Sequence, residues 1–340
     1  MSQSIDPRQL SLFDNRLQLE LERLAPFGNR NRPLDGILPT GSVTMDAAMG
    51  VGGLPRGRMI ELFGPPAVGK TTLGLQAIAA AQRQGETAAL IDAEHAYDPS
   101  YAEQVGVDTE SLLVAAAEDG QQAFRIMEKL AASKAVDIIL VDSLAAMLTP
   151  EEREAAIGEA NPFAQCEMIA SGLRRLARVL ASSPACVLFL NQTRSYKGYG
   201  YTETSAGGWS LKLHAAVRAD VRERRELRDG KRLSVRVVKN QLAATAQHEF
   251  DFAGGVGAVP EAELIDLGMD TGVVSVTPRG LMFDGEVLGR NRETAIARIA
   301  GHFTLMAELR VAVRAALGLP QTKTVGRAGL ELVQQRATGS

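Results

Sequence analysis

The sequence predicts an α/β protein with a mainly parallel central sheet. Short apolar runs alternate with helical stretches along residues 59–190, a pattern typical of parallel strands that helices bury on both faces. A glycine-rich loop stands between the first run and the helix after it, as in phosphate-binding α/β proteins. A chain of 340 residues is long enough for one large core and a smaller domain.

The strands and the first helix are predicted from these runs. The parallel strands are expected at residues 59–63, 88–91, 138–141 and 187–190. Residues 71–84 have a helical pattern, and Gly85 suits the end of that helix. Two later runs, 217–223 and 233–239, indicate antiparallel strands. The sheet therefore begins parallel and is expected to end antiparallel.

Punctuation by proline and glycine divides the chain into four predicted regions. Residues 1–33 interleave leucines with charges and end in a Pro/Gly-rich linker, which favours a helical arm. Residues 34–257 form the predicted core, and residues 258–318 a small C-terminal α/β domain. Residues 319–340 contain little apolar sequence and are expected to be a flexible tail.

Composition excludes several classes of protein. Apolar residues make up 45% of the chain, but no apolar run is long enough for a membrane span. No signal-peptide-like stretch opens the sequence, and two cysteines are too few for a disulfide framework. We therefore expect a cytoplasmic protein without membrane contact. A net charge of −3 gives no overall attraction to nucleic acid, so any DNA site must depend on particular residues.

The strongest single motif is a phosphate-binding loop. It matches G-x-x-x-x-G-K-[ST] at every fixed position and consists of Gly64, Pro65, Pro66, Ala67, Val68, Gly69, Lys70 and Thr71. Its backbone N–H groups and the helix that follows favour phosphate oxygens. Lys70 would bind the β- and γ-phosphates, and the Thr71 hydroxyl would bind Mg²⁺. The motif predicts an ATP and Mg²⁺ site.

Four polar residues stand after three of the predicted strands and are candidates for the same site. Asp142 could hold Mg²⁺ through water, or it could cap the next helix. Glu94 could activate the attacking water, although a plain loop carboxylate explains its spacing equally well. Asn191 and Gln192 could contact the γ-phosphate, or they could cap a loop. The neighbouring His95 is expected to be a packing residue.

Five ordered motifs resemble the bacterial RecA recombinase family. They are Gly-Pro-x-x-x-Gly-Lys-Thr-Thr at 64–72, Ile-Asp-Ala-Glu-His-Ala at 91–96, Val-Asp-Ser at 141–143, Asn-Gln-x-Arg at 191–194 and Val-Val-Lys-Asn at 237–240. The similarity is nearly collinear from Gly41 to about Arg298. It implies a RecA-type P-loop ATPase core.

The resemblance also implies roles for individual nucleotide-site residues. Lys70 and Thr71, followed by Thr72, would hold ATP and its metal, with Asp142 on the metal side. Glu94 would be the catalytic base, and Gln192 would sense the γ-phosphate. Tyr101 would stack on adenine, although its sequence alone indicates only a core or surface aromatic residue. Lys239 would reach the ATP of a neighbouring subunit in a filament.

Two segments, residues 151–167 and 195–208, correspond to the family's DNA-binding loops. From the resemblance and the local chemistry together we expect these residues to contact DNA: Ser171, Arg174, Tyr196, Lys197, Tyr199, Gly207 and Gly208. The second segment interleaves aromatic and basic residues, which suits stacking on single-stranded bases. The alternative is a mobile surface loop whose aromatic rings pack on the sheet.

The implied function is an ATP-dependent DNA recombinase. Such a protein forms filaments on single-stranded DNA and pairs it with homologous double-stranded DNA in DNA repair and the SOS response. The implied partners are both forms of DNA, further copies of this chain and the SOS repressor.

Several positions depart from the family pattern. Gln241 stands where the family has a second lysine, and Glu167 stands where it has an arginine. Pro162 lies near the family's methionine wedge, and Leu213 replaces an interface aromatic residue. The second DNA segment is also about two residues shorter than usual, and the strongly acidic tail of many members is absent. We expect slower hydrolysis, weaker DNA binding and retained ATP binding.

These departures support an alternative function. A weakly hydrolysing adaptor would bind ATP and DNA and recruit the sliding clamp or a translesion polymerase. The segment Gln9–Phe13 resembles a clamp-docking peptide, in which Leu12 and Phe13 would fill an apolar pocket. An ordinary amphipathic helix start explains the same five residues.

Overall fold

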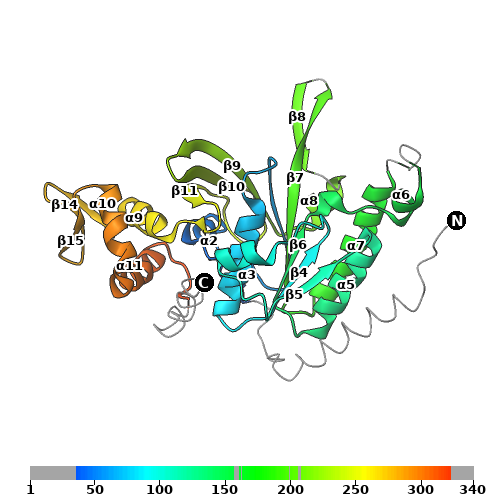
Figure 1. The fold of residues 1–340 in the computed structure, drawn as a ribbon, viewed down its shortest axis with the longest axis horizontal. Helices are drawn as coiled ribbons and strands as arrows, with labels where there is room; N and C mark the ends of the chain where they lie inside the picture. The colour runs from blue at the N-terminus through cyan, green and yellow to red at the C-terminus, as the bar shows by residue number, and fades with distance from the viewer. Residues whose placement is uncertain (1–35, 157–160, 162, 199, 206–207, 323–340) are drawn as a thin grey trace.

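The computed structural model describes residues 36–156, 161, 163–198, 200–205 and 208–322. Figure 1 shows a central sheet with helices on both faces, a projecting hairpin, and a smaller unit of helices and short strands at one end. The arm predicted at residues 1–33 and most of the predicted tail lie outside the described residues.

The central sheet runs in the order β12-β11-β10-β9-β3-β7-β6-β4-β5. Its parallel part comprises β3 (Met59–Gly64), β4 (Ala88–Asp92), β5 (Leu113–Ala116), β6 (Ile138–Asp142), β7 (Cys186–Gly198) and β9 (Val217–Leu227). The antiparallel part comprises β10 (Gly230–Asn240), β11 (Gln247–Ala253) and β12 (Gly257–Ala258). This arrangement confirms the predicted α/β fold with a mainly parallel sheet. A separate short pair consists of β1 (Ile37–Leu38) and β2 (Leu54–Pro55).

Alternate strand residues form two apolar cores, one on each face of the sheet. On one face Leu62, Leu140 and Leu190 pack with α3 (Lys70–Arg83) and α4 (Pro99–Val105). On the other face Val141 and Phe189 pack with α5 (Gly120–Ser133) and α7 (Ala164–Leu180). Burial on both faces explains why the strands read as continuous apolar runs.

The second predicted DNA-binding loop is a β-hairpin in the structure. Strand β7 continues past the edge of the sheet to Gly198 and pairs with β8 (Gly200–Ser205) in an antiparallel ladder. Figure 1 shows this hairpin projecting away from the core. The short helix α8 (Gly208–His214) follows it and packs against α7. In the first segment, α6 (Pro150–Glu154) precedes the described start of α7.

A third apolar core lies in the C-terminal unit. The unit contains α9 (Pro260–Thr271), β13 (Ser275–Thr277), β14 (Gly280–Phe283), β15 (Glu286–Gly289), α10 (Arg292–Ala300) and α11 (Phe303–Ala316). Its core includes residues of α2 (Val43–Ala48), which lies ahead of the parallel sheet in the sequence. The unit is therefore packed against the main body rather than tethered to it.

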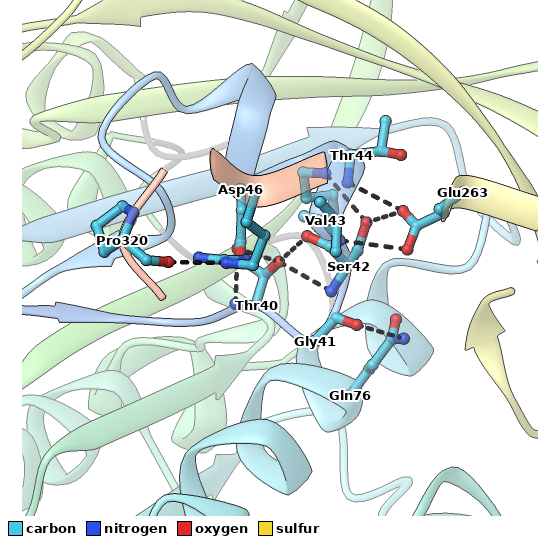
Figure 2. Close-up of polar contacts among 11 residues, drawn as sticks. Thr40, Gly41, Ser42, Val43, Thr44, Asp46, Gln76, Glu263 and Pro320 are labelled. Carbon is cyan, nitrogen blue, oxygen red and sulfur yellow. Dashed lines mark hydrogen bonds and ion pairs between the residues drawn. The ribbon is translucent and has the colours of Figure 1, made fainter. Parts of the chain in front are cut away.

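Buried polar side chains fix this junction. Arg314 on α11 donates to Asp46 on α2 at 2.7 Å, and both side chains are almost fully buried. Glu263 on α9 accepts hydrogen bonds from the hydroxyl of Ser42 and from the backbone N–H of Val43 and Thr44. Figure 2 shows both clusters meeting around α2. Because each of these buried polar groups has hydrogen-bond partners, the junction is specified by geometry as well as by apolar contact.

No helix among the described residues is long and apolar enough to cross a membrane.

Candidate functional site

The phosphate-binding loop lies where β3 ends and α3 begins. Two of its glycines have no room for a side chain: a Cβ on Gly64 would lie 2.2 Å from the Val221 carbonyl oxygen, and one on Gly69 would lie 2.5 Å from the Phe252 ring. Gly69 also has φ of 106°, which favours glycine. The Lys70 ammonium donates to the carbonyl oxygens of Gly64 and Pro65, at 3.2 and 2.7 Å. Lys70 is thus held inside the curl of the loop.

The two predicted metal-side residues lie next to each other. The Thr71 hydroxyl donates to Oδ2 of Asp142 at 2.7 Å, although 71 positions separate them in the sequence. Among the described residues no group of three or more His, Cys, Asp or Glu side chains could hold a metal ion. Mg²⁺ commonly takes one or two protein oxygens and completes its shell with water and phosphate. A hydroxyl and a carboxylate side by side therefore fit Mg²⁺ bound with a nucleotide.

The electrostatics of this edge favour an incoming cation. Burial raises the pKa of Asp142 to about 6, the hydrogen bond from Thr71 lowers it, and the nearby carboxylates of Glu94 and Asp92 raise it further. Burial lowers the pKa of Lys70, while Asp142 and Glu94 oppose that change. Asp142 and Glu94 thus both act on Lys70, and a divalent ion would relieve the repulsion among the carboxylates at this edge.

Glu94 and Gln192 meet although Glu94 follows β4 and Gln192 lies on β7. The Gln192 side-chain amide donates to Oε1 of Glu94 at 3.1 Å, and the Ser143 hydroxyl donates to the same oxygen at 2.5 Å. Ser143 directly follows Asp142, so the segment after β6 connects the metal-side carboxylate to Glu94. Five of the predicted nucleotide-site residues therefore gather at one edge of the sheet: Lys70, Thr71, Glu94, Asp142 and Gln192.

Sequence reasoning gave no role to two residues that position this edge. Asp92 is buried at the end of β4 and accepts hydrogen bonds from the backbone N–H groups of Ala96 and Tyr97. It therefore holds the turn that carries Glu94, as Ser143 holds the Glu94 carboxylate. Asp92 and Ser143 both lie in the family motifs, each within two residues of a residue with an expected role. That proximity is the sequence feature that could have pointed to them. The packing role expected for His95 is wrong, because its side chain is exposed.

Tyr101 lies on α4, beside Thr72, the third residue of the helix that follows the loop. Its hydroxyl shares a hydrogen bond of 2.6 Å with Thr72 and accepts one of 3.2 Å from the backbone N–H of Gly255. The ring is half-buried against the apolar core. These contacts fix the ring beside the helix that follows the phosphate loop.

Lys239 does not join the nucleotide site of its own chain. It lies on β10, which is separated from β3 by β9, and its backbone register faces Arg218. Its ammonium donates to the carbonyl oxygens of Lys212 and Leu213 at the end of α8, both at 2.8 Å. Contact between Lys239 and a nucleotide therefore requires the nucleotide of a second copy.

The predicted DNA contacts on α7 share one exposed face. Ser171 and Arg174 are both exposed, and Glu167 lies on the same helical face one turn before Ser171. Gly208 begins α8 beside this helix. A Cβ atom placed on Gly208 would lie 3.7 Å from the Cys166 sulfur on α7. The next residue, Trp209, is 76% exposed. The start of α8 thus borders an exposed face of α7 that carries one negative side chain, Glu167, and one positive side chain, Arg174.

The remaining predicted DNA contacts are described only in part. Tyr196 and Lys197 have backbone positions on the β7–β8 hairpin, but their side chains are not described. Tyr199, Gly207 and Pro162 lie outside the described residues, as does the peptide Gln9–Phe13.

The carboxyl edge of the sheet defines the class of this protein. A Gly-Lys-Thr loop after one parallel strand and an aspartate at the end of a strand two positions away are the arrangement of a P-loop nucleotide-binding protein. The sequence model of the RecA N-terminal domain matches residues 22–259. The chain belongs to the RecA family of DNA recombinases.

Individual relatives support this assignment. The chain is 41% identical over 301 residues to Protein RecA of Frankia casuarinae, an alignment that covers 86% of this chain and 87% of that protein. It is also 41% identical to Protein RecA of Desulforapulum autotrophicum and 40% identical to that of Mycobacteroides abscessus, with the same coverage. These alignments extend well beyond the phosphate loop and confirm the resemblance inferred from the five motifs.

Proposed function

We propose that this chain is an ATP-dependent recombinase that forms filaments on single-stranded DNA and pairs it with homologous double-stranded DNA in repair and the SOS response. The observation that carries the proposal is the hydrogen bond between Gln192 and Glu94, at the point where β7 leaves the nucleotide edge and continues into the projecting hairpin. A group that senses nucleotide and a segment suited to DNA thus lie on one strand.

The nucleotide chemistry divides among the gathered residues. Lys70 and the loop backbone bind the phosphates, and Thr71 with Asp142 holds Mg²⁺, which neutralises phosphate charge when it is bound. Glu94 orients a water molecule and accepts its proton. The hydrogen bond from Ser143 keeps the Glu94 carboxylate turned toward this edge. Tyr101 supports the adenine ring.

DNA binds along the exposed face of α7 and the hairpin. Arg174 contacts one phosphate, Ser171 and the backbone of Gly207 and Gly208 contact others, and Tyr196, Lys197 and Tyr199 contact bases and backbone. Glu167 lies on the same face as Arg174 and repels phosphate. We therefore expect weaker DNA binding, with a smaller dependence on salt, than an arginine at position 167 would give.

Hydrolysis within a filament is slowed by the loss of one charge. Lys239 supplies a cation to the ATP of the neighbouring copy, but the exposed residue two positions later is Gln241. Cations that stabilise the transferring phosphate contribute strongly to catalysis. With Lys239 but no second lysine at position 241, we expect ATP binding to be retained and ATP hydrolysis to be slowed.

Further partners are proposed from the sequence. Gln9–Phe13 docks on the replicative sliding clamp, and the ATP-bound filament engages the SOS repressor in the cytoplasm. A pull-down with purified clamp tests the first proposal. Binding that is lost in a Phe13→Ala variant supports it, and no binding by the unmodified chain contradicts it.

Electron microscopy tests the main proposal. The purified chain is mixed with single-stranded DNA and either a slowly hydrolysed ATP analogue, ADP or no nucleotide. We expect helical filaments with the analogue and few or none with ADP. The Lys70→Ala variant, which keeps the fold but loses the phosphate contact, should form none. Absence of filaments from the unmodified chain with the analogue would contradict a recombinase function.

A further inference from the structure

A buried polar chain connects the nucleotide edge to the base of the hairpin. Its centre is Glu61 on β3, whose side chain has no exposed surface. Oε1 of Glu61 accepts a hydrogen bond of 2.8 Å from the Asn191 side-chain amide. Oε2 accepts a hydrogen bond from Nε of Arg218 on β9. Both carboxylate oxygens are therefore used, each by a residue of a different neighbouring strand.

The first end of this chain reaches the proposed γ-phosphate sensor. The side-chain oxygen of Asn191 accepts a hydrogen bond of 2.9 Å from the backbone N–H of Gln192. Asn191 itself is fully buried. A movement of the Gln192 backbone would therefore move the Asn191 side chain. It would thereby disturb the hydrogen bond between Asn191 and Glu61.

The second end reaches the hairpin. Nη2 of Arg218 donates to the Ser205 hydroxyl at 3.2 Å. Ser205 is the last residue of β8, is 3% exposed, and is paired across the ladder with Thr193, the residue after Gln192. The Arg218 guanidinium also lies over the Phe63 ring at 4.7 Å, and Phe63 directly precedes the phosphate-binding loop. Arg218 thus contacts two parts of the site region: the strand before the loop, through Glu61 and Phe63, and the base of the hairpin, through Ser205.

We propose that Glu61 and Arg218 are positioning residues that couple the nucleotide site to the DNA-binding hairpin. Both ends of the hairpin are then held by the sheet: the outgoing strand through Asn191 and Glu61, and the returning strand through Ser205 and Arg218. A buried carboxylate such as Glu61 is costly to leave without its partners. A movement of the outgoing strand is therefore transmitted through Glu61 and Arg218 to the returning strand. The hairpin is therefore set as a unit when nucleotide binding moves Gln192.

This inference rests on the proposed function and adds a coupling route to it. Coupling is reciprocal: if ATP raises DNA affinity by some factor, DNA raises ATP affinity by the same factor. Loss of the route should lower that factor and leave each affinity alone nearly unchanged. A purely structural role predicts a lower melting temperature or a change in both separate affinities instead.

The experiment measures four affinities for each variant. Binding of a fluorescent slowly hydrolysed ATP analogue is titrated with and without oligo(dT), and binding of labelled oligo(dT) is titrated with and without the analogue. Ser205→Ala removes only the hydroxyl that Arg218 reaches. Arg218→Lys keeps a cation for Glu61 but lacks the second nitrogen that reaches Ser205. Ser205→Thr restores the hydroxyl, and Ser234→Ala, a buried serine on β10, is the matched control.

We expect the coupling factor to fall about fivefold or more in Ser205→Ala and Arg218→Lys, and to be unchanged in Ser234→Ala and restored in Ser205→Thr. If Arg218→Lys proves unstable on melting, Ser205→Ala decides the result alone. Wild-type coupling that persists in Ser205→Ala would overturn the inference. An unmodified chain in which the analogue and oligo(dT) do not affect each other would instead contradict the proposed function.

Discussion

The Gln192 amide and the Glu94 carboxylate are hydrogen-bonded to each other at 3.1 Å. The proposed phosphate sensor and the proposed water-activating acid are therefore not independent. A phosphate that attracts the Gln192 amide would remove one of the two donors on Glu94 and leave the Ser143 hydroxyl in place. Release of that donor frees a carboxylate lone pair for water at the moment nucleotide is in position.

This relationship gives the first prediction. In a Gln192→Ala variant, ATP affinity should fall by no more than about tenfold, because one hydrogen bond contributes only about 1 kcal/mol. The increase in DNA affinity caused by ATP should be lost. Anisotropy of labelled oligo(dT), with and without a slowly hydrolysed analogue, measures both effects. The control is Gln121→Ala, an exposed glutamine on α5. Undiminished coupling in Gln192→Ala would show that Gln192 is not the sensor.

The second prediction concerns the metal. Thr71→Ala removes the hydroxyl that lies 2.7 Å from Asp142, whereas Thr71→Ser retains a hydroxyl. We expect the Mg²⁺ concentration needed for half-maximal ATP binding to rise about tenfold in Thr71→Ala and to change little in Thr71→Ser. A Mg²⁺ titration followed by fluorescence of an ATP analogue measures this. Equal Mg²⁺ requirements in the two variants would place the ion elsewhere.

The third prediction concerns the missing lysine. Gln241→Lys should raise DNA-dependent ATP hydrolysis about tenfold or more, because a cation supplied across the filament interface stabilises the transferring phosphate. Gln247→Lys adds the same charge at an exposed position on β11 and should have no such effect. Steady-state phosphate release at saturating DNA is the measurement. A rate that does not change in Gln241→Lys would show that this charge does not limit turnover.

The fourth prediction concerns stability against pH. Burial raises the pKa of Glu263 from 4.5 to about 7, although hydrogen bonds from Ser42 and Thr44 oppose the change. Between these values the folded state binds the proton more tightly than the unfolded state does. The contribution to stability is therefore greatest below pH 4.5 and is lost as pH rises toward 7, by about 3 kcal/mol in total.

A Glu263→Gln variant should lack this dependence, because the amide does not titrate. Urea unfolding of both proteins between pH 5 and 8, at roughly half-unit steps, tests the prediction. We expect the stability difference between the variant and the unmodified chain to change in favour of the variant as pH rises. A difference that is constant with pH would mean that Glu263 is ionised in the folded state throughout the range.

The sequence predicted the sheet well because its strands are buried on both faces. Continuous apolar runs such as 138–141 and 187–190 appear as strands in the structure, with ends shifted by a residue or more. The hairpin was missed because residues 195–205 are polar, aromatic and glycine-rich, without the alternation of a half-buried strand. Its ladder continues from β7, which composition does not reveal.

The candidate site was predictable wherever a residue of a known motif stands just after a predicted strand or at the start of the helix after it. Lys70, Thr71, Glu94, Asp142 and Gln192 belong to this group, and the structure brings them together. Glu61 and Arg218 could not be predicted, because the role of a charged residue inside an apolar strand depends on its partners on other strands, which the sequence does not show. The junction of Asp46 with Arg314 spans 268 positions and was invisible for the same reason.

One measurement tests the central claim most directly: steady-state ATP hydrolysis with and without single-stranded DNA, in the unmodified chain and in Glu94→Gln. The account predicts that DNA stimulates hydrolysis by the unmodified chain. It also predicts that Glu94→Gln loses at least about a hundredfold of that activity while binding the ATP analogue and forming filaments normally. Equal DNA-stimulated hydrolysis by the two proteins would contradict the account.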